Sequence, residues 1–126
     1  MVLQVVLIAQ LLATVYMTGL IWFVQIVHYP LLASVDEAHF SAYERAHQQR
    51  TTWVVAPPML VELLAALALL GWPEAVGGWA LALLNLGSVV LLWLATALWQ
   101  MPLHARLTEG QDVLRIRQLV LSNWLR

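Results

Sequence analysis

Long apolar runs separated by short polar segments form the main pattern along the chain. Residues 2–28 and 75–101 contain no charged side chain, and residues 53–72 contain one, Glu62. At about 1.5 Å of rise per residue, each run is long enough as an α-helix to cross a hydrocarbon core of about 30 Å. The pattern therefore predicts an all-α integral membrane protein: one membrane domain over residues 1–126, built as a helical bundle with three transmembrane spans.

The polar segments between the runs predict how the spans are joined. Residues 35–50 are expected to form a connecting helix between the first two spans. The short, glycine-rich link at 71–79 predicts a tight antiparallel hairpin between the second and third spans. Residues 111–126 carry apolar side chains at helical spacing but are too few to cross the bilayer. They predict an amphipathic helix at the membrane interface, or the start of a fourth span.

The arginines predict the direction in which the spans cross the membrane. Arg45 and Arg50 lie in the first connection, and Arg106, Arg115 and Arg117 follow the third span. The second connection carries no arginine. Because basic residues gather in cytoplasmic loops, the N-terminus is expected outside. The first connection and the segment after the third span are expected in the cytoplasm. A bacterial inner membrane is the expected location.

Composition supports the membrane assignment and excludes several classes of chemistry. Only 10% of the residues are charged, whereas soluble domains carry roughly 25%. The chain has no cysteine, which excludes disulfides, thiolate metal ligands and a cysteine nucleophile. It also has no lysine for Schiff-base chemistry, and its net charge of −1 predicts no nucleic-acid partner.

Polar side chains in the first and third spans gather on one face of each predicted helix. At 100° per residue, those of the first span fall within an arc of about 120°. They are Gln4, Gln10, Thr14, Thr18, Gln25, His28 and Tyr29 in the first span, and Asn85, Ser88, Thr96 and Gln100 in the third. Because polar groups are costly in lipid, both faces are expected to point into the bundle. They would either join the helices by hydrogen bonds or line a polar cavity open to the cytoplasmic face.

The histidines fall at the predicted cytoplasmic end of the bundle. His28 ends the first span, His104 follows the third, and His47 lies on the connecting helix. Glu44 precedes His47 by three residues, which is the Glu-x-x-His spacing of carboxylate-bridged di-metal bundles. We therefore expect a site for iron or copper with His28, Glu44, His47 and His104 as ligands. The alternative is that each histidine is an amphipathic residue at the interface, and His39 fits this alternative best because about 12 Å of helix separates it from His47.

The same residues could instead hold a haem. His28 and His104 stand at similar depth on different spans, so they could be the two axial ligands of a non-covalent b-type haem. Gln25 and Gln100 would then lie beside the cofactor.

Glu62 is the only ionisable residue deep inside a predicted span. Such residues are costly in lipid and often functional. The sequence leaves open whether Glu62 is a proton acceptor, a metal ligand or an acid hydrogen-bonded to its neighbours.

Four segments of the chain resemble a small four-span membrane family that includes the anthrone oxygenases. They are "VHYP" at 27–30, "APPMLVELLAALALL" at 56–70, "MPLHARL" at 101–107 and "NWLR" at 123–126. The resemblance covers most of the chain, although its motifs are short. It implies a four-helix membrane bundle and oxygenase-type chemistry on a hydrophobic aromatic substrate.

Individual positions carry this resemblance unequally. Pro102, Leu107, Asn123 and Arg126 match the family's pattern after the third span. His104 stands where the family typically has asparagine, and this departure is compatible with a metal-using branch.

Together these features predict an oxygenase- or oxidoreductase-like enzyme that acts on a lipophilic substrate. The residues expected to carry the chemistry are His104, Glu62, Asn123 and Arg126, assisted by His28, Glu44 and His47. An arginine at the cavity mouth could hold an oxyanion. The alternative is a non-catalytic small subunit or scaffold, in a larger membrane complex or a homo-oligomer, that binds haem or pigment. A transporter in which Glu62 carries protons is a third interpretation.

Overall fold

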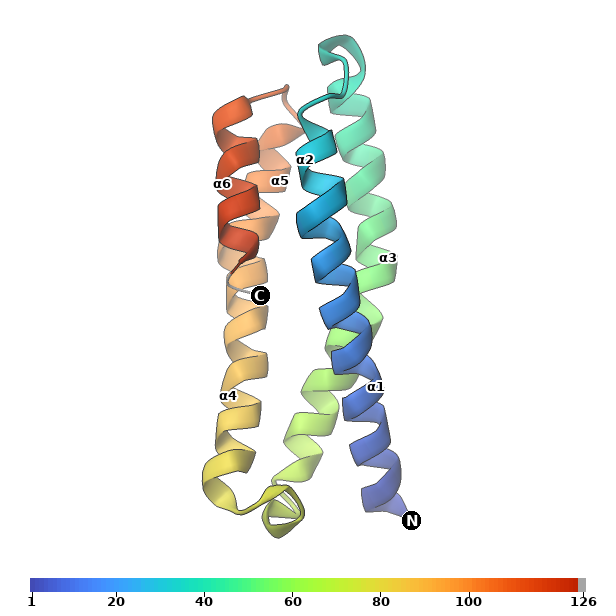
Figure 1. Ribbon diagram of the computed structural model, residues 1–126, viewed down its shortest axis with the longest axis vertical. Coiled ribbons are helices and arrows are strands. Elements are labelled where there is room, and N and C mark those ends of the chain that lie inside the picture. The colour runs from blue at the N-terminus through green and yellow to red at the C-terminus, as the bar shows by residue number, and fades with distance from the viewer. Residues whose placement is uncertain (125–126) are drawn as a thin grey trace.

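The computed structural model describes residues 1–124, and every regular element in that range is helical. In chain order these are α1 (Val2–Phe23), η1 (Val24–His28), α2 (Tyr29–Leu32), α3 (Glu37–Leu69), η2 (Pro73–Val76), α4 (Trp79–Ala95), η3 (Thr96–Gln100), α5 (Met101–Leu107) and α6 (Val113–Asn123). The elements α1 to α2 run on as one rod, and so do α4 to α5 (Figure 1). Together with α3, these rods form an elongated bundle whose two ends differ.

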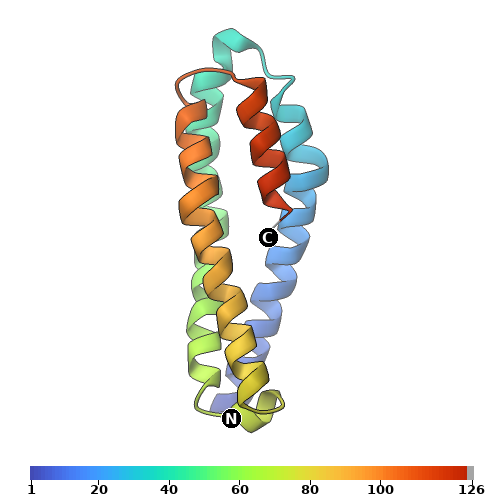
Figure 2. The same ribbon diagram turned by 90° about the vertical axis from the view of Figure 1, so that its left-hand side faces the viewer.

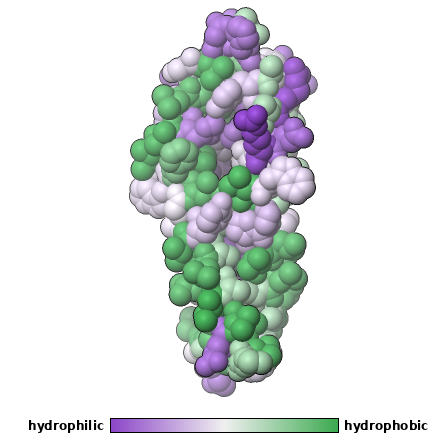
Figure 3. Space-filling view, turned by 90° about the vertical axis from the view of Figure 1, so that its right-hand side faces the viewer, coloured by the Kyte–Doolittle hydropathy of each residue, from purple (hydrophilic) through white to green (hydrophobic). Residues whose placement is uncertain are grey.

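The three rods are long and apolar enough to cross a membrane. They are Val2–Leu32, Glu37–Leu69 and Trp79–Leu107. Large apolar side chains cover their outward faces, and Figure 3 shows hydrophobic residues over the lower part of the molecule, with hydrophilic residues gathered towards the upper end. The predicted all-α membrane bundle with three such helices is therefore confirmed.

The helix α3 differs from the sequence prediction. A separate connecting helix at 35–50 and a span at 53–72 were expected, but a single helix of 33 residues covers Glu37–Leu69. No glycine or proline interrupts residues 49–53, so nothing local stops the helix there. Pro57 and Pro58 lie inside it, where they cannot donate backbone hydrogen bonds. Figure 1 shows that the lower part of α3 runs in a different direction from its upper part.

Two wide π-helical turns occupy matching places in the first and third rods. Each turn ends directly before an X-Pro step, at Tyr29-Pro30 in one rod and Met101-Pro102 in the other. The amide N–H groups of Tyr29 and Met101 each bond to the carbonyl oxygen five residues earlier. A π-turn adds one residue to the helical repeat. The helix can therefore continue past proline, which has no N–H group to donate. These turns bury Gln25 and Gln100 inside the bundle.

The helix α6 packs against the other helices at the upper end of the bundle. It is capped by Asp112, whose side chain accepts hydrogen bonds from two backbone N–H groups of the first turn. Figure 2 shows it between the α4–α5 rod and the α1–α2 rod, at the upper end only. Its residues Ile116 and Leu119 are buried with Phe40 and Leu107 in the main apolar core. With 11 residues, α6 is too short to span a membrane by itself. The interfacial helix and the start of a fourth span both stay predictions for residues 111–126.

Candidate functional site

A buried polar cluster lies at the upper end, where four helices meet. It draws side chains from α2, α3 and α5, and the apolar core around Phe40 and Leu107 adjoins it. Glu44 is completely buried there, although isolated buried carboxylates are unfavourable. The partners of Glu44 therefore decide what the cluster can do.

A carboxylate, an imidazole and a phenol form a hydrogen-bonded chain at the centre of the cluster. Oε1 of Glu44 lies 2.5 Å from Nδ1 of His104, and Nε2 of His104 lies 3.2 Å from the hydroxyl of Tyr29. An ionised Glu44 can only accept, so Nδ1 of His104 carries the proton. Nε2 is then the acceptor for the O–H group of Tyr29. The chain therefore runs from carboxylate to imidazole to phenol with a donor facing an acceptor at each of its two links.

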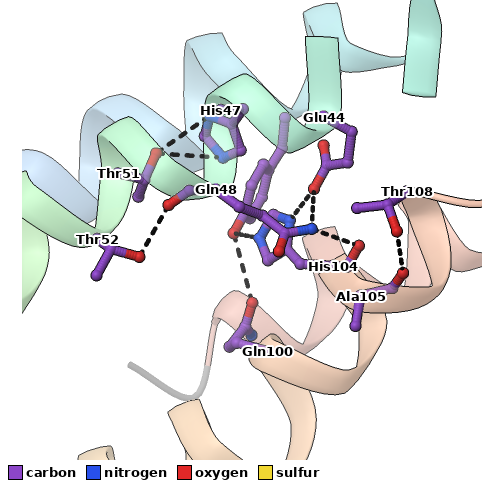
Figure 4. Close-up of polar contacts among 10 residues, drawn as sticks. Glu44, His47, Gln48, Thr51, Thr52, Gln100, His104, Ala105 and Thr108 are labelled. Carbon is purple, nitrogen blue, oxygen red and sulfur yellow. Dashed lines mark hydrogen bonds and ion pairs between the residues drawn. The ribbon is translucent and has the colours of Figure 1, made fainter. Parts of the chain in front are cut away.

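Two glutamines hold this chain in place. The amide nitrogen of Gln48 donates to the backbone oxygen of His104 at 2.7 Å and lies 3.4 Å from Oε1 of Glu44 (Figure 4). Gln100 presents its oxygen 3.4 Å from the hydroxyl of Tyr29. Gln48 fixes α5 against α3, and Gln100 fixes the phenol from the wide turn η3.

The other two histidines of the cluster stack on each other at its half-buried side. The ring centroids of His28 and His47 are 4.3 Å apart, with an angle of 23° between the planes. Tyr43 lies 6.4 Å from His47 with nearly parallel rings, and His47 lies 5.4 Å from His104. The hydroxyl of Thr51 is 3.1 Å from Nδ1 of His47. Three histidines on three different elements thus converge.

His39 takes no part in this cluster. Its side chain is exposed and lies 3.0 Å from Asp36, which is also exposed. The sequence interpretation of His39 as a surface residue agrees with this position.

The residues expected to bind a metal come together, but their arrangement does not fit a metal ion. In residues 1–124, no three histidine, aspartate or glutamate side chains are placed to hold one. Glu44 and His104 bond to each other, which leaves only Nε2 of His28 and Oε2 of Glu44 as buried atoms without a described hydrogen-bond partner in the cluster. Protein metal sites use three or more protein ligands.

The haem alternative fits no better. Both ring nitrogens of His104 are engaged, one by Glu44 and one by Tyr29. His104 therefore has no free ring nitrogen for the second axial bond. The ring of His28 stacks on the ring of His47.

Glu62 lies in a different part of the bundle. It is 18 residues after Glu44 on the same helix, which corresponds to about 27 Å along the axis. The hydroxyl of Thr14 donates to Oε1 of Glu62 at 2.7 Å, joining α1 to α3. The structure thus separates Glu62 from the histidine cluster and gives it a neighbour on the polar face of the first span.

Gln25 and Asn123 belong to a second polar group, which fastens α6. Nδ2 of Asn123 donates to Oε1 of Gln25 at 2.7 Å, and Nε2 of Gln25 donates to the backbone oxygen of Val120 at 3.2 Å. The nitrogen of Gln100 donates to the hydroxyl of Ser122 at 2.9 Å. Both wide turns thus hold α6 through a glutamine. Arg126, predicted at the cavity mouth, lies outside the described residues.

The hydroxyl groups on the polar face of the third span form hydrogen bonds within their own helix. The hydroxyls of Ser88 and Thr96 each donate to the carbonyl oxygen four residues earlier. Of these polar residues, Gln100 bonds to other helices. The expected interhelical bonding is therefore concentrated at the wide turn.

Gln48 and Tyr43 are members of the cluster that the sequence prediction did not include. Gln48 follows Glu44 by four residues and so shares its helix face, a spacing that could have identified it. Tyr43 precedes His47 by four residues in the same way. Both positions fall within the connecting helix predicted for residues 35–50, so the helical spacing was already part of the prediction.

Two surface pockets among residues 1–124 lie away from the histidine cluster. One, of about 200 Å³, lies between α1 and the end of α6 and is lined by Thr18, Ile21, Trp22, Gln25, Asn123 and Trp124. The other is an open groove of about 610 Å³ between α1 and α3, beside Pro57 and Pro58. The half-buried faces of His28 and His47 are therefore the part of the cluster nearest the surface.

No family model, curated protein or solved structure matches the chain in comparisons with known proteins. The resemblance to the anthrone-oxygenase family stays a prediction from short motifs. The function is therefore argued from the geometry of the cluster.

Proposed function

We propose that the protein is a membrane-embedded enzyme of the oxygenase or oxidoreductase type that removes a proton from a lipophilic substrate. The observation that carries this proposal is the 2.5 Å contact between the fully buried Glu44 and His104. A buried carboxylate favours positive charge on neighbouring imidazoles. Burial opposes this charge. We propose that one imidazole at a time in the cluster of His28, His47 and His104 takes up the proton, with the negative charge of Glu44 compensating it.

The roles of the residues follow from their exposure. His28 and His47 are half-buried, so a substrate can approach them from the surface. His104, held by Glu44 and Gln48, lies behind them and shares the added charge. In the proposed step, a C–H bond of the substrate breaks, its proton moves to an imidazole nitrogen, and its electron pair stays on carbon. Molecular oxygen is the oxidant that then takes up these electrons.

The orientation in the membrane is part of the same proposal. The end that carries the cluster also carries Arg45, Arg50 and Arg106. The opposite connection carries only Glu74 as a charged residue. Arginine-rich ends face the cytoplasm, so we place the cluster at the cytoplasmic face and the N-terminus outside.

Oxygen consumption with a defined probe tests the proposed activity. Anthrone is a lipophilic aromatic ketone with an acidic methylene group, and its oxidation by one O₂ gives anthraquinone and one water. Glu44→Gln keeps the shape and a hydrogen-bond acceptor but removes the negative charge. We expect Glu44→Gln to slow the reaction about 10²-fold to 10⁴-fold, the range for acid–base catalysis.

The matched control is His39→Ala, at an exposed histidine outside the cluster. This variant should leave the rate unchanged. If the wild-type protein does not accelerate anthrone oxidation over empty membranes, the proposal fails for this substrate class. Equal rates in Glu44→Gln and wild type would remove the cluster from the reaction.

A second function, as a non-catalytic subunit of a membrane complex, is favoured by one observation. The two pockets described above, in residues 1–124, lie away from the histidine cluster, and the cluster joins side chains of several helices. In that case the cluster would fix the helices for a partner. Glu44→Gln would then lower recovery of the assembled complex while no oxidation activity is found in any variant.

A further inference from the structure

Tyr29 is distinguished from the other two tyrosines of the chain by its surroundings. Its ring is buried among Leu32, Phe40 and Leu107. Tyr16 and Tyr43, in contrast, are exposed on the outside of the bundle. A buried phenol in an apolar shell is shielded from solvent and from molecules that would react with it.

The hydroxyl of Tyr29 has a proton acceptor at hand. Nε2 of His104 lies 3.2 Å away. Nδ1 of the same ring lies 2.5 Å from Oε1 of Glu44 and donates its hydrogen to it. The imidazole can therefore accept a proton at one nitrogen while its other nitrogen stays bonded to a carboxylate. The positive charge so formed would lie directly beside the negative charge of Glu44.

Electrostatics favour the removal of an electron from this site. With Glu44 ionised and His104 and Tyr29 neutral, the chain of three groups carries one negative charge in an apolar environment. In residues 1–124, Glu44 contacts His104 and forms no ion pair with an arginine. Loss of one electron would leave a carboxylate, an imidazolium and an uncharged phenoxyl group, so the buried net charge falls to zero. Burying a net charge is costly, and the oxidised state avoids that cost.

We propose that Tyr29 is a redox-active tyrosine that is oxidised with transfer of its proton to His104. In this step the O–H bond of Tyr29 breaks, and the proton forms an N–H bond at Nε2 of His104. The electron leaves to a high-potential one-electron oxidant, and a neutral tyrosyl radical remains. Reduction of the radical returns the proton to the phenol. This inference does not depend on the oxidation of a lipophilic substrate proposed above.

His104 is the positioning and proton-accepting partner in this reaction. Its Nε2 is a basic nitrogen within hydrogen-bond distance of the phenol, whereas the neighbouring Leu32, Phe40 and Leu107 are apolar. The oxygen of Gln100, 3.4 Å from the phenol, can hold a hydrogen bond but cannot take up the proton. Glu44 acts through His104 by stabilising the imidazolium.

Flash oxidation followed by electron paramagnetic resonance tests the proposal. The full chain in lipid nanodiscs is oxidised with photogenerated tris(bipyridine)ruthenium(III) and frozen. Ring-deuterated tyrosine distinguishes a tyrosyl signal from radicals on the seven tryptophans. We expect a tyrosyl signal that outlives any exposed tyrosyl radical at least tenfold and that forms at least twofold more slowly in D₂O.

The variants assign the signal to one residue. Tyr29→Phe should abolish it, while Tyr16→Phe, at an exposed tyrosine outside the cluster, should leave it unchanged. His104→Gln, which keeps a polar side chain but cannot accept the proton, should also abolish it. Glu44→Gln provides a second route if His104→Gln does not fold, and should shorten the lifetime at least tenfold. A signal that survives Tyr29→Phe, or that forms at the same rate in H₂O and D₂O, would overturn the proposal.

Discussion

Asn123 and Gln25 lie 98 residues apart in the sequence, and a 2.7 Å hydrogen bond joins their side-chain amides inside the bundle. The bond links α6 to the wide turn η1. Gln25 in turn donates to the backbone of Val120, so both ends of its amide are engaged by α6. This pair is the main polar attachment of α6 to the first rod.

Removing both partners of this pair should cost less stability than the sum of the two single removals. Asn123→Ala leaves Oε1 of Gln25 buried without its donor, and we expect a loss of about 1–3 kcal/mol in the free energy of unfolding. A double replacement of Gln25 and Asn123 by leucine should cost less than the sum of the single replacements. Denaturation in detergent micelles, followed by circular dichroism, measures each term of this double-mutant cycle.

Ser88→Ala is the control for that cycle. Its hydroxyl is exposed and bonds only within its own helix, so the change in stability should stay within about 0.5 kcal/mol. Additive effects at Gln25 and Asn123 would contradict the coupling inferred from the structure.

The spans were predictable because charge is absent from them. A long run with almost no charged residues has few alternatives to a membrane helix, and each of the three rods overlaps one of the predicted spans. The sequence also predicted that His28, His47 and His104 lie at the same end of the bundle, but not that they converge, because convergence depends on how the helices pack. The pairing of Glu44 with His104 was not predictable either, because it depends on how α3 and α5 are rotated about their axes.

Two other differences have separate causes. The continuity of α3 could have been inferred, since no helix-breaking residue separates Gln49 from Trp53, and it would have placed Glu62 about 27 Å from Glu44 at once. The packing of α6 could not have been inferred from the sequence. Its apolar face suits a membrane surface and a bundle interior equally well.

Proline substitution tests whether α3 is continuous. Thr52 lies in the middle of this helix, at the place where a separate connecting helix would have ended. Thr52→Pro should destabilise the protein by about 3 kcal/mol, because proline cannot donate the helical hydrogen bond and clashes with the preceding turn. Thermal unfolding in detergent measures the effect.

Glu37→Pro is the matched comparison for Thr52→Pro. Glu37 is the first residue of the same helix, where proline is well tolerated. Its effect should be below about 0.5 kcal/mol. If both prolines are tolerated equally, the chain between the two parts of α3 is a loop.

Replacing Thr14 tests the role of Glu62. Thr14→Val removes the hydroxyl that donates to Glu62 at 2.7 Å and keeps the side-chain shape. Hydrogen bonds between membrane helices contribute about 0.6–1.7 kcal/mol, so a loss in this range is expected. The reaction rate with anthrone and the yield of the Tyr29 radical should not change. A changed rate would connect Glu62 to the cluster despite the distance along α3.

Single-cysteine labelling tests the orientation in the membrane. The chain has no cysteine, so each introduced thiol is the only one. Glu74 and Glu109 are both exposed and lie at opposite ends of the bundle. With the cluster at the cytoplasmic face, a membrane-impermeant maleimide should label Glu74→Cys in intact cells and should label Glu109→Cys only after permeabilisation. Both variants should label fully in detergent, which controls for accessibility. The reverse pattern would place the histidine cluster on the outer face, where a substrate and an oxidant would have to reach it from outside the cell.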